Sequence, residues 1–194
     1  MKLSNRSKAL WLSIATVGYN VIEGIAAIVV GLVTNSSALV GFGADSFIES
    51  ISGSVMIWRF SKVRSSEDEE RVEERAEKLV GYSFFILGAY VLYEAARQLF
   101  FGEAPDRSAF GIILATLSLV IMPFLYLAKN RLGKKMGSRS LVADSKQTLA
   151  CIMLSATLFI GVSLNYFFGL GWADAAAGVI ISLFIFHEGK ESLE

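Results

Sequence analysis

The feature that most constrains this chain is a set of six apolar runs, each long enough to cross a lipid bilayer as a helix. The bilayer core is roughly 30 Å thick, and a helix needs about 20 apolar residues to span it. Hydrophobic residues make up 54% of the chain, which is unusual for a soluble domain. The sequence therefore predicts an all-α fold, a six-helix transmembrane bundle in one domain of residues 1–194. The runs cover residues 10–33, 37–60, 79–101, 109–128, 141–164 and 172–187.

The distribution of basic residues predicts the orientation of these helices. Lysines and arginines gather before the first run, between the second and third, and between the fourth and fifth, whereas Arg97 and Arg107 lie at the opposite ends. By the positive-inside rule, both termini are expected to be cytoplasmic. No cleavable targeting signal stands out, so a multi-pass protein of the plasma (inner) membrane is expected. The short connections after the first, third and fifth runs predict that consecutive helices form antiparallel hairpins.

An acidic segment, residues 67–77, precedes the third apolar run. Ser66 and Glu69 have the spacing of a capping box, which predicts that a helix begins here and continues into the run. The acidic side chains would then stabilise the helix, because they lie at the positive end of its dipole. The alternative interpretation is a mouth that gathers cations.

Two carboxylates, Asp45 and Glu49, interrupt the second run within "GADSFIES". An ionised acid at this depth costs several kcal/mol and needs a partner, a water-filled cavity or a proton. The two acids lie one helical turn apart on one face, where their charges repel each other unless a cation lies between them. A bound cation is the economical explanation, and a purely structural role is the alternative.

The fifth run carries a second pair with the same spacing, Gln147 and Cys151, with Asp144 one turn earlier in "VADSKQTLAC". The second and fifth helices run in opposite directions in the predicted topology. If they are neighbours, Cys151 lies nearer Asp45 and Gln147 lies nearer Glu49. Two carboxylates, a thiolate and an amide oxygen would then form a four-coordinate site suited to zinc or a similar divalent ion.

These two segments also carry a resemblance to a known family. "NSSALVGFGADSFIESISGS" resembles the second-helix signature of the cation diffusion facilitator family of divalent metal transporters, with Asp45 and Glu49 at its two ligand positions. "LVADSKQTLAC" is similar to the fifth-helix segment, where an Ala-Asp pair precedes a His-x-x-x-Asp ligand pair. Here Gln147 and Cys151 occupy those positions, so the tetrahedral Asp/His set is not reproduced.

The resemblance implies a secondary transporter that exports a divalent metal, Zn²⁺ first, with protons as counter-ion. It implies a homodimer in the lipid bilayer, and a short membrane-only form without the C-terminal cytoplasmic domain, or a truncation of a longer chain. Family members pack helices one, two, four and five around the site and set three and six aside. Asn20 and Glu23 of the first run, together with Asp144, are therefore possible accessory groups.

Other functions fit the sequence less well. "GFGAD" is similar to the Gly-x-Gly-Asp motif of intramembrane aspartyl proteases, but its spacing differs by one residue and no second aspartate at that depth is evident. A non-transporting membrane partner that kept the fold and lost the metal site is the other alternative. We expect no enzymatic activity, no prosthetic group and no nucleic-acid partner. The metal enters as a transported substrate.

Overall fold

The computed structural model describes residues 4–34, 37–62, 66–101, 109–168 and 172–193. These residues form six helices and, within the described ranges, no strand, which confirms the all-α prediction. Each predicted apolar run lies inside one of these helices. The helices are α1 (Asn5–Thr34), α2 (Ser37–Ser61), α3 (Ser66–Phe101), α4 (Ala109–Met136), α5 (Arg139–Phe168) and α6 (Trp172–Glu191).

Three of the described helices are long and apolar enough to cross a membrane by length and composition alone. They are α1, α3 and α4, over Asn5–Val33, Asp68–Phe101 and Ile112–Met136. In contrast, α2 and α5 carry ionisable and hydroxyl side chains along their buried faces. That all six helices span the membrane remains a prediction.

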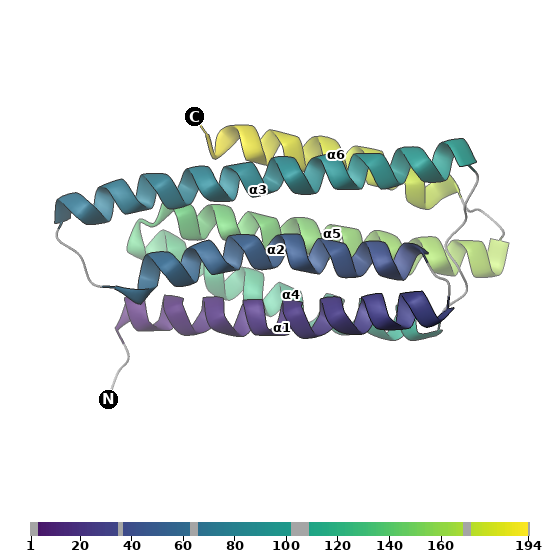
Figure 1. Ribbon diagram of the computed structural model, residues 1–194, viewed down its shortest axis with the longest axis horizontal. Coiled ribbons are helices and arrows are strands. Elements are labelled where there is room, and N and C mark those ends of the chain that lie inside the picture. The colour runs from purple at the N-terminus through teal and green to yellow at the C-terminus, as the bar shows by residue number, and fades with distance from the viewer. Residues whose placement is uncertain (1–3, 35–36, 63–65, 102–108, 169–171, 194) are drawn as a thin grey trace.

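The helices pack in three pairs, α1 with α2, α4 with α5, and α3 with α6 (Figure 1). The first two pairs form one four-helix group, and the α3–α6 pair lies along its α2 and α5 side. This is the division that the family resemblance implied. The expected hairpin of consecutive helices is present in the α1–α2 pair, but it is wrong for α3, which packs mainly against α6 and not against α4.

Small residues explain why α3 takes α6 as its partner. A Cβ atom added to Gly88 would lie 3.0 Å from Phe186, and one added to Gly178 would lie 3.1 Å from the Cβ of Ala95. The rings of Phe85 and Phe186 meet with their centroids 5.9 Å apart. In a membrane, such close packing of small and aromatic residues takes the place of a hydrophobic driving force between helices.

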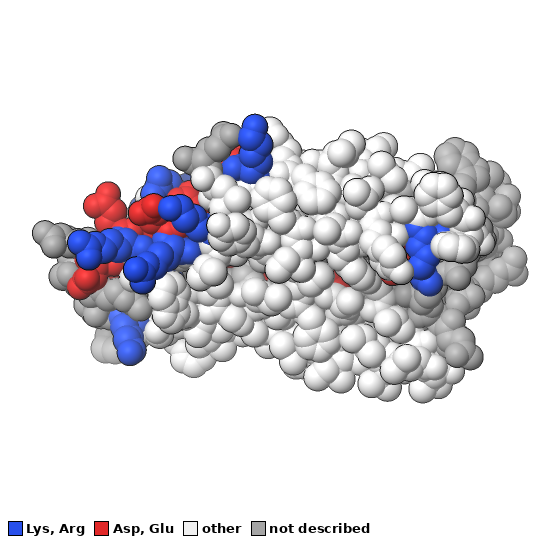
Figure 2. Space-filling view, turned by 45° about the horizontal axis from the view of Figure 1, so that its top comes forward, with Lys and Arg blue, Asp and Glu red and all other residues white. Residues whose placement is uncertain are grey.

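Both termini lie at one end of the bundle, where most of the visible charged side chains gather, while the middle of the visible surface is almost entirely uncharged (Figures 1 and 2). The acidic segment belongs to this end. As predicted, α3 begins at Ser66, whose side chain is outside the described part of the structure. The carboxylate of Glu69 forms ion pairs with Arg6 of α1 and Arg59 of α2. These contacts favour a structural role for the acidic segment over a cation-gathering mouth.

A second acid of this segment, Glu73, joins three helices at the charged end. It pairs with Arg59, and it accepts hydrogen bonds of 2.9 Å from the hydroxyl of Ser138 and from the backbone N–H of Ser140. A carboxylate at the first turn of α5 satisfies free N–H groups and complements the helix dipole. Gly137, with a φ of 66°, makes the turn from α4 into α5.

Two glycines bring α1 and α2 into backbone contact. A Cβ atom on Gly43 would lie 2.6 Å from Cγ1 of Ile28 and 2.8 Å from the carbonyl oxygen of Gly24. The backbone oxygen cannot rotate away as a side chain can. Glycine at position 43 is therefore required for α1 to lie close against α2.

We predict that Gly43→Ala lowers the midpoint of thermal unfolding in detergent micelles, because the added methyl group separates α1 from α2. The expected cost is about 1–3 kcal/mol, as for other overpacked sites. Gly18→Ala is the matched control, since a Cβ at Gly18 meets nothing within 4 Å. It should leave stability unchanged or raise it by about 0.5–1 kcal/mol through helix propensity. Equal midpoints for the two variants would contradict the close approach.

Candidate metal site

The facing sides of α2 and α5 bring together the acids and the cysteine that the sequence singled out. The thiol of Cys151 donates a hydrogen bond to Oδ2 of Asp45 at 3.1 Å. One turn along α2, Oε1 of Glu49 accepts a hydrogen bond of 2.7 Å from the hydroxyl of Thr148. All four side chains are buried. The antiparallel register therefore sets Cys151 beside Asp45, as the sequence predicted.

Gln147 is not hydrogen-bonded to Glu49. Its Oε1 accepts a hydrogen bond of 2.8 Å from the hydroxyl of Ser83 on α3. The face of α5 that meets Glu49 passes through Asp144, Thr148 and Cys151, at helical spacings of four and three, and Gln147 lies to one side of it. Thr148 is thus a site residue that the sequence argument missed, although its spacing from Cys151 was a usable signal.

Helix α1 contributes Glu23 and Asn20 to the buried polar face against α2. The hydroxyl of Tyr19 donates to Oε1 of Glu23 at 2.7 Å, and the hydroxyl of Ser46 donates to Oε2 at 3.0 Å. Ser46 directly follows Asp45 in the chain, so Glu23 borders the carboxylate pair. Asn20 is fully buried one turn earlier on α1.

Several buried polar atoms in the described part of the structure have no hydrogen-bond partner. They include Oδ1 of Asp45, Oε2 of Glu49, Nε2 of Gln147 and both amide atoms of Asn20. Such atoms are rare in folded proteins, and each needs a water molecule, an ion or a functional reason. Within the described residues, however, no three His, Cys, Asp or Glu side chains are gathered closely enough to hold a metal ion. The donors lie in neighbouring subsets, Asp45 with Cys151 and Glu49 with Thr148.

Asp144 belongs to a different part of the same network. Its Oδ2 lies 2.9 Å from Nζ of Lys129 on α4, and its Oδ1 accepts a hydrogen bond of 2.6 Å from the hydroxyl of Ser52. Lys129 also donates to the hydroxyl of Thr148 at 3.0 Å. The sequence analysis ended the fourth run at residue 128, but α4 continues to Met136 and carries Lys129 inside the bundle with 0% exposure.

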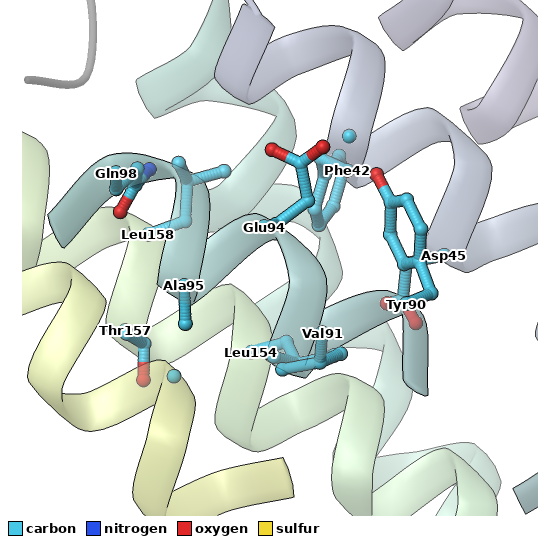
Figure 3. A pocket seen from close by; sticks show the side chains of 12 residues that line it. Phe42, Asp45, Tyr90, Val91, Glu94, Ala95, Gln98, Leu154, Thr157 and Leu158 are labelled. Carbon is cyan, nitrogen blue, oxygen red and sulfur yellow. The ribbon is translucent and has the colours of Figure 1, made fainter. Parts of the chain in front are cut away.

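A cavity of about 110 Å³ reaches Asp45 from the side of the α3–α6 pair (Figure 3). Its walls come from α2, α3, α5 and α6, and it has room for a few water molecules. Tyr90 lies beside Asp45, and Glu94, which pairs with Arg97 at 3.2 Å, lies farther along α3. A Cβ on Gly41 would lie 2.8 Å from the Tyr90 hydroxyl oxygen, so the glycine leaves room for this ring. From Asp45 the cavity extends along α3 past Glu94 to Gln98, away from the charged end of the bundle.

The comparison with protein families agrees with this arrangement. The family model "Cation efflux transmembrane domain" matches residues 13–193, nearly the whole chain. The chain belongs to the cation efflux family. Its members are transporters, and this chain is accordingly an integral membrane protein.

Curated relatives of this cation efflux chain include proteins of Xenopus laevis and of two Bacillus species. Transmembrane protein 163 of Xenopus laevis is 25% identical over 97% of this chain and 67% of its own length. A cadmium, cobalt and zinc/H⁺-K⁺ antiporter of Bacillus velezensis is 27% identical over 96% of this chain and 60% of its own. A manganese efflux system protein of Bacillus subtilis is 24% identical over 81% of this chain and 56% of its own. The chain therefore spans between 56 and 67% of the length of these relatives.

The Thr148 hydroxyl, which accepts from Lys129 and donates to Glu49, gives a direct test of this network. We predict that Thr148→Val lowers the free energy of unfolding by about 1–3 kcal/mol, because it leaves two buried charged groups without this partner. Thr148→Ser keeps the hydroxyl and should recover most of the loss. Thermal unfolding of the two variants in micelles measures the difference. A valine variant as stable as the serine variant would show that the hydroxyl does not bridge these groups.

Proposed function

We propose that this chain exports a divalent metal cation through the membrane by alternating access, with Zn²⁺ as its first expected substrate and protons as the counter-ion. The observation that carries the proposal is the buried contact between Asp45 and Cys151 on the facing sides of α2 and α5. It joins an acid and a sulfur donor inside a chain of the cation efflux family. The acids would have no comparable use in a protein that only packs against another.

The donor types support a particular class of ion. A carboxylate from Asp45, a carboxylate from Glu49 and a thiolate from Cys151 together favour zinc or cadmium, while an oxygen-only site would suit magnesium or calcium. Gln147 borders this set, and Glu23 and Asn20 are accessory groups. The names of the Bacillus relatives, which include cadmium, cobalt, zinc and manganese, agree with a divalent transition metal or its neighbours. The metal would be cargo and not a resident cofactor.

The arrangement of the donors supports a carrier better than a storage site. Oε2 of Glu49 and Oδ1 of Asp45 have no partner among the described residues, while the second oxygen of each acid is held by a neighbour. An arriving ion would find these two oxygens free and would draw the acids together. When the ion leaves, Thr148 and Cys151 hold the acids again. Such a site closes only around its ion, which allows release as well as binding.

Proton binding and release would couple metal transport to the proton gradient. The Cys151 thiol must lose its proton before the sulfur can bind metal, so binding releases a proton and protonation favours release of the metal. Gln147 cannot carry a proton, which leaves Asp45, Glu49 and Cys151 for this role. We further propose that all six helices cross the plasma membrane with the charged end and both termini in the cytoplasm. As the family resemblance implies, two copies would associate as a homodimer.

The test is metal flux into liposomes that contain the purified protein, followed with a dye inside the vesicles. We expect zinc to cross with the wild-type protein, faster with a proton gradient than without it. Asp45→Ala should reduce the flux at least tenfold, because the site loses a ligand that no neighbour replaces. Glu70→Ala, an exposed acid at the charged end of α3, is the matched control and should transport like the wild type.

The alternative is a non-transporting membrane partner that kept the fold. If neither zinc, cobalt, manganese nor iron crosses, and Asp45→Ala behaves as the wild type does, the alternative becomes the better explanation. If a metal crosses at the same rate with and without a proton gradient, transport stands and proton coupling is wrong.

Cadmium gives a separate test of the sulfur ligand, because a bound thiolate produces a ligand-to-metal charge-transfer absorption band in the ultraviolet. Cys151 is the one cysteine of the sequence, so the band has a single source. We expect wild-type protein in micelles to develop the band on addition of cadmium, and Cys151→Ser to develop none. Cadmium binding without the band would show that the acids bind the ion without the thiol.

A further inference from the structure

The most unusual charge in the bundle is Lys129, a lysine with 0% exposure on α4. A buried ammonium group is costly unless it is paired and hydrogen-bonded. Its Nζ lies 2.9 Å from Oδ2 of Asp144 and donates a hydrogen bond of 3.0 Å to the hydroxyl of Thr148. Asp144 accepts a further hydrogen bond from Ser52. Lys129 is therefore held in a fixed place by groups from α5.

One hydroxyl separates this ammonium group from the proposed metal site. The hydroxyl of Thr148 accepts a hydrogen bond from Lys129 and donates one of 2.7 Å to Oε1 of Glu49. The positive charge is thus linked to Glu49 through Oε1, while Oε2 has no partner among the described residues. The acids that the described helices bring near this level are Glu23 from α1, Asp45 and Glu49 from α2, and Asp144 from α5.

We infer that Lys129 is a built-in counter-charge of the metal site, which offsets the carboxylates when the site is empty and weakens the hold on the ion when it is full. The inference rests on the proposed function and adds to it a residue that sets affinity. Without such a charge, several buried acids would repel one another in the empty carrier and bind a divalent ion too tightly to release it. Lys129 acts through Thr148 and its field, and it does not touch the ion.

Charge-changing variants test this inference by the sign of their effects. The readout is the equilibrium dissociation constant of Zn²⁺ in micelles, measured by competition with a fluorescent chelator. Lys129→Met should tighten binding about tenfold, since the repulsion is lost, and Asp144→Asn should weaken it by a similar factor, since Lys129 is left uncompensated. Lys129→Arg keeps the charge and should bind as the wild type does. Lys134→Met, an exposed lysine of the same helix, is the matched control and should change nothing.

The double variant Lys129→Met with Asp144→Asn separates the remaining explanations, and it also avoids leaving one buried charge unpaired. A counter-charge predicts that the opposite effects cancel, so the double variant binds within about threefold of the wild type. If it binds as weakly as Asp144→Asn, Asp144 is a ligand and the inference is overturned. If both single variants weaken binding and the double variant restores it, the pair is structural and the inference is again overturned.

Faster unfolding or poor expression of Lys129→Met does not remove the test, because Asp144→Asn retains the lysine and a hydrogen-bonding partner for it. Asp144→Asn binding as tightly as the wild type contradicts the counter-charge. A wild-type protein that binds no zinc overturns the proposed function and this inference with it. A wild-type protein that binds and moves zinc, with variants that fail the sign pattern, overturns only the inference.

Discussion

The dominant physical constraint on this molecule is the burial of several carboxylates inside an apolar bundle. Each ionised acid costs several kcal/mol unless neighbours supply hydrogen bonds or charge. Those neighbours come from different helices: Ser46 for Glu23, Cys151 for Asp45, Thr148 for Glu49. The acids of α2 are satisfied by α5, and the acid of α1 is satisfied by α2, so these contacts require α2 to lie between α1 and α5. The polar contacts and the backbone contact of α1 with α2 therefore specify the same arrangement.

The bundle is tied differently at its two ends. At the charged end, Glu73 of α3 joins Arg59 of α2 and the first turn of α5, so the α3–α6 pair is fastened to the four-helix group there. Toward the opposite end, the cavity beside Asp45 lies between these same two groups. Ion pairs hold one end and a water-sized space separates the other. For the carrier proposed above, this asymmetry would leave the site reachable from one side.

Much of this could be predicted from the sequence, for reasons that are local. Apolar length predicts the six helices, and the spacing of Asp45 and Glu49 places both on one face. The register that brings Cys151 to Asp45 follows from antiparallel neighbours. The partner of α3 could not be predicted, since it depends on how glycines such as Gly88 fit distant aromatic rings. The choice of Thr148 over Gln147 depends on a rotation of α5 that spacing alone does not define.

Lys129 shows how a strong residue-type rule conceals a buried position. A lysine after a long apolar run indicates the end of a span, and the positive-inside rule is enough to explain it. Yet Ser118 and Met122 on the same helix are buried, and steps of seven and four residues lead from Met122 to Lys129 and on to the buried Gly133. Helical periodicity therefore places Lys129 on the inner face of α4, although its charge favours an exposed position. Helical periodicity and residue type disagree at this position, and a buried partner, Asp144, makes the burial of the lysine possible. Such a disagreement in a sequence therefore indicates a charge that is paired inside the bundle.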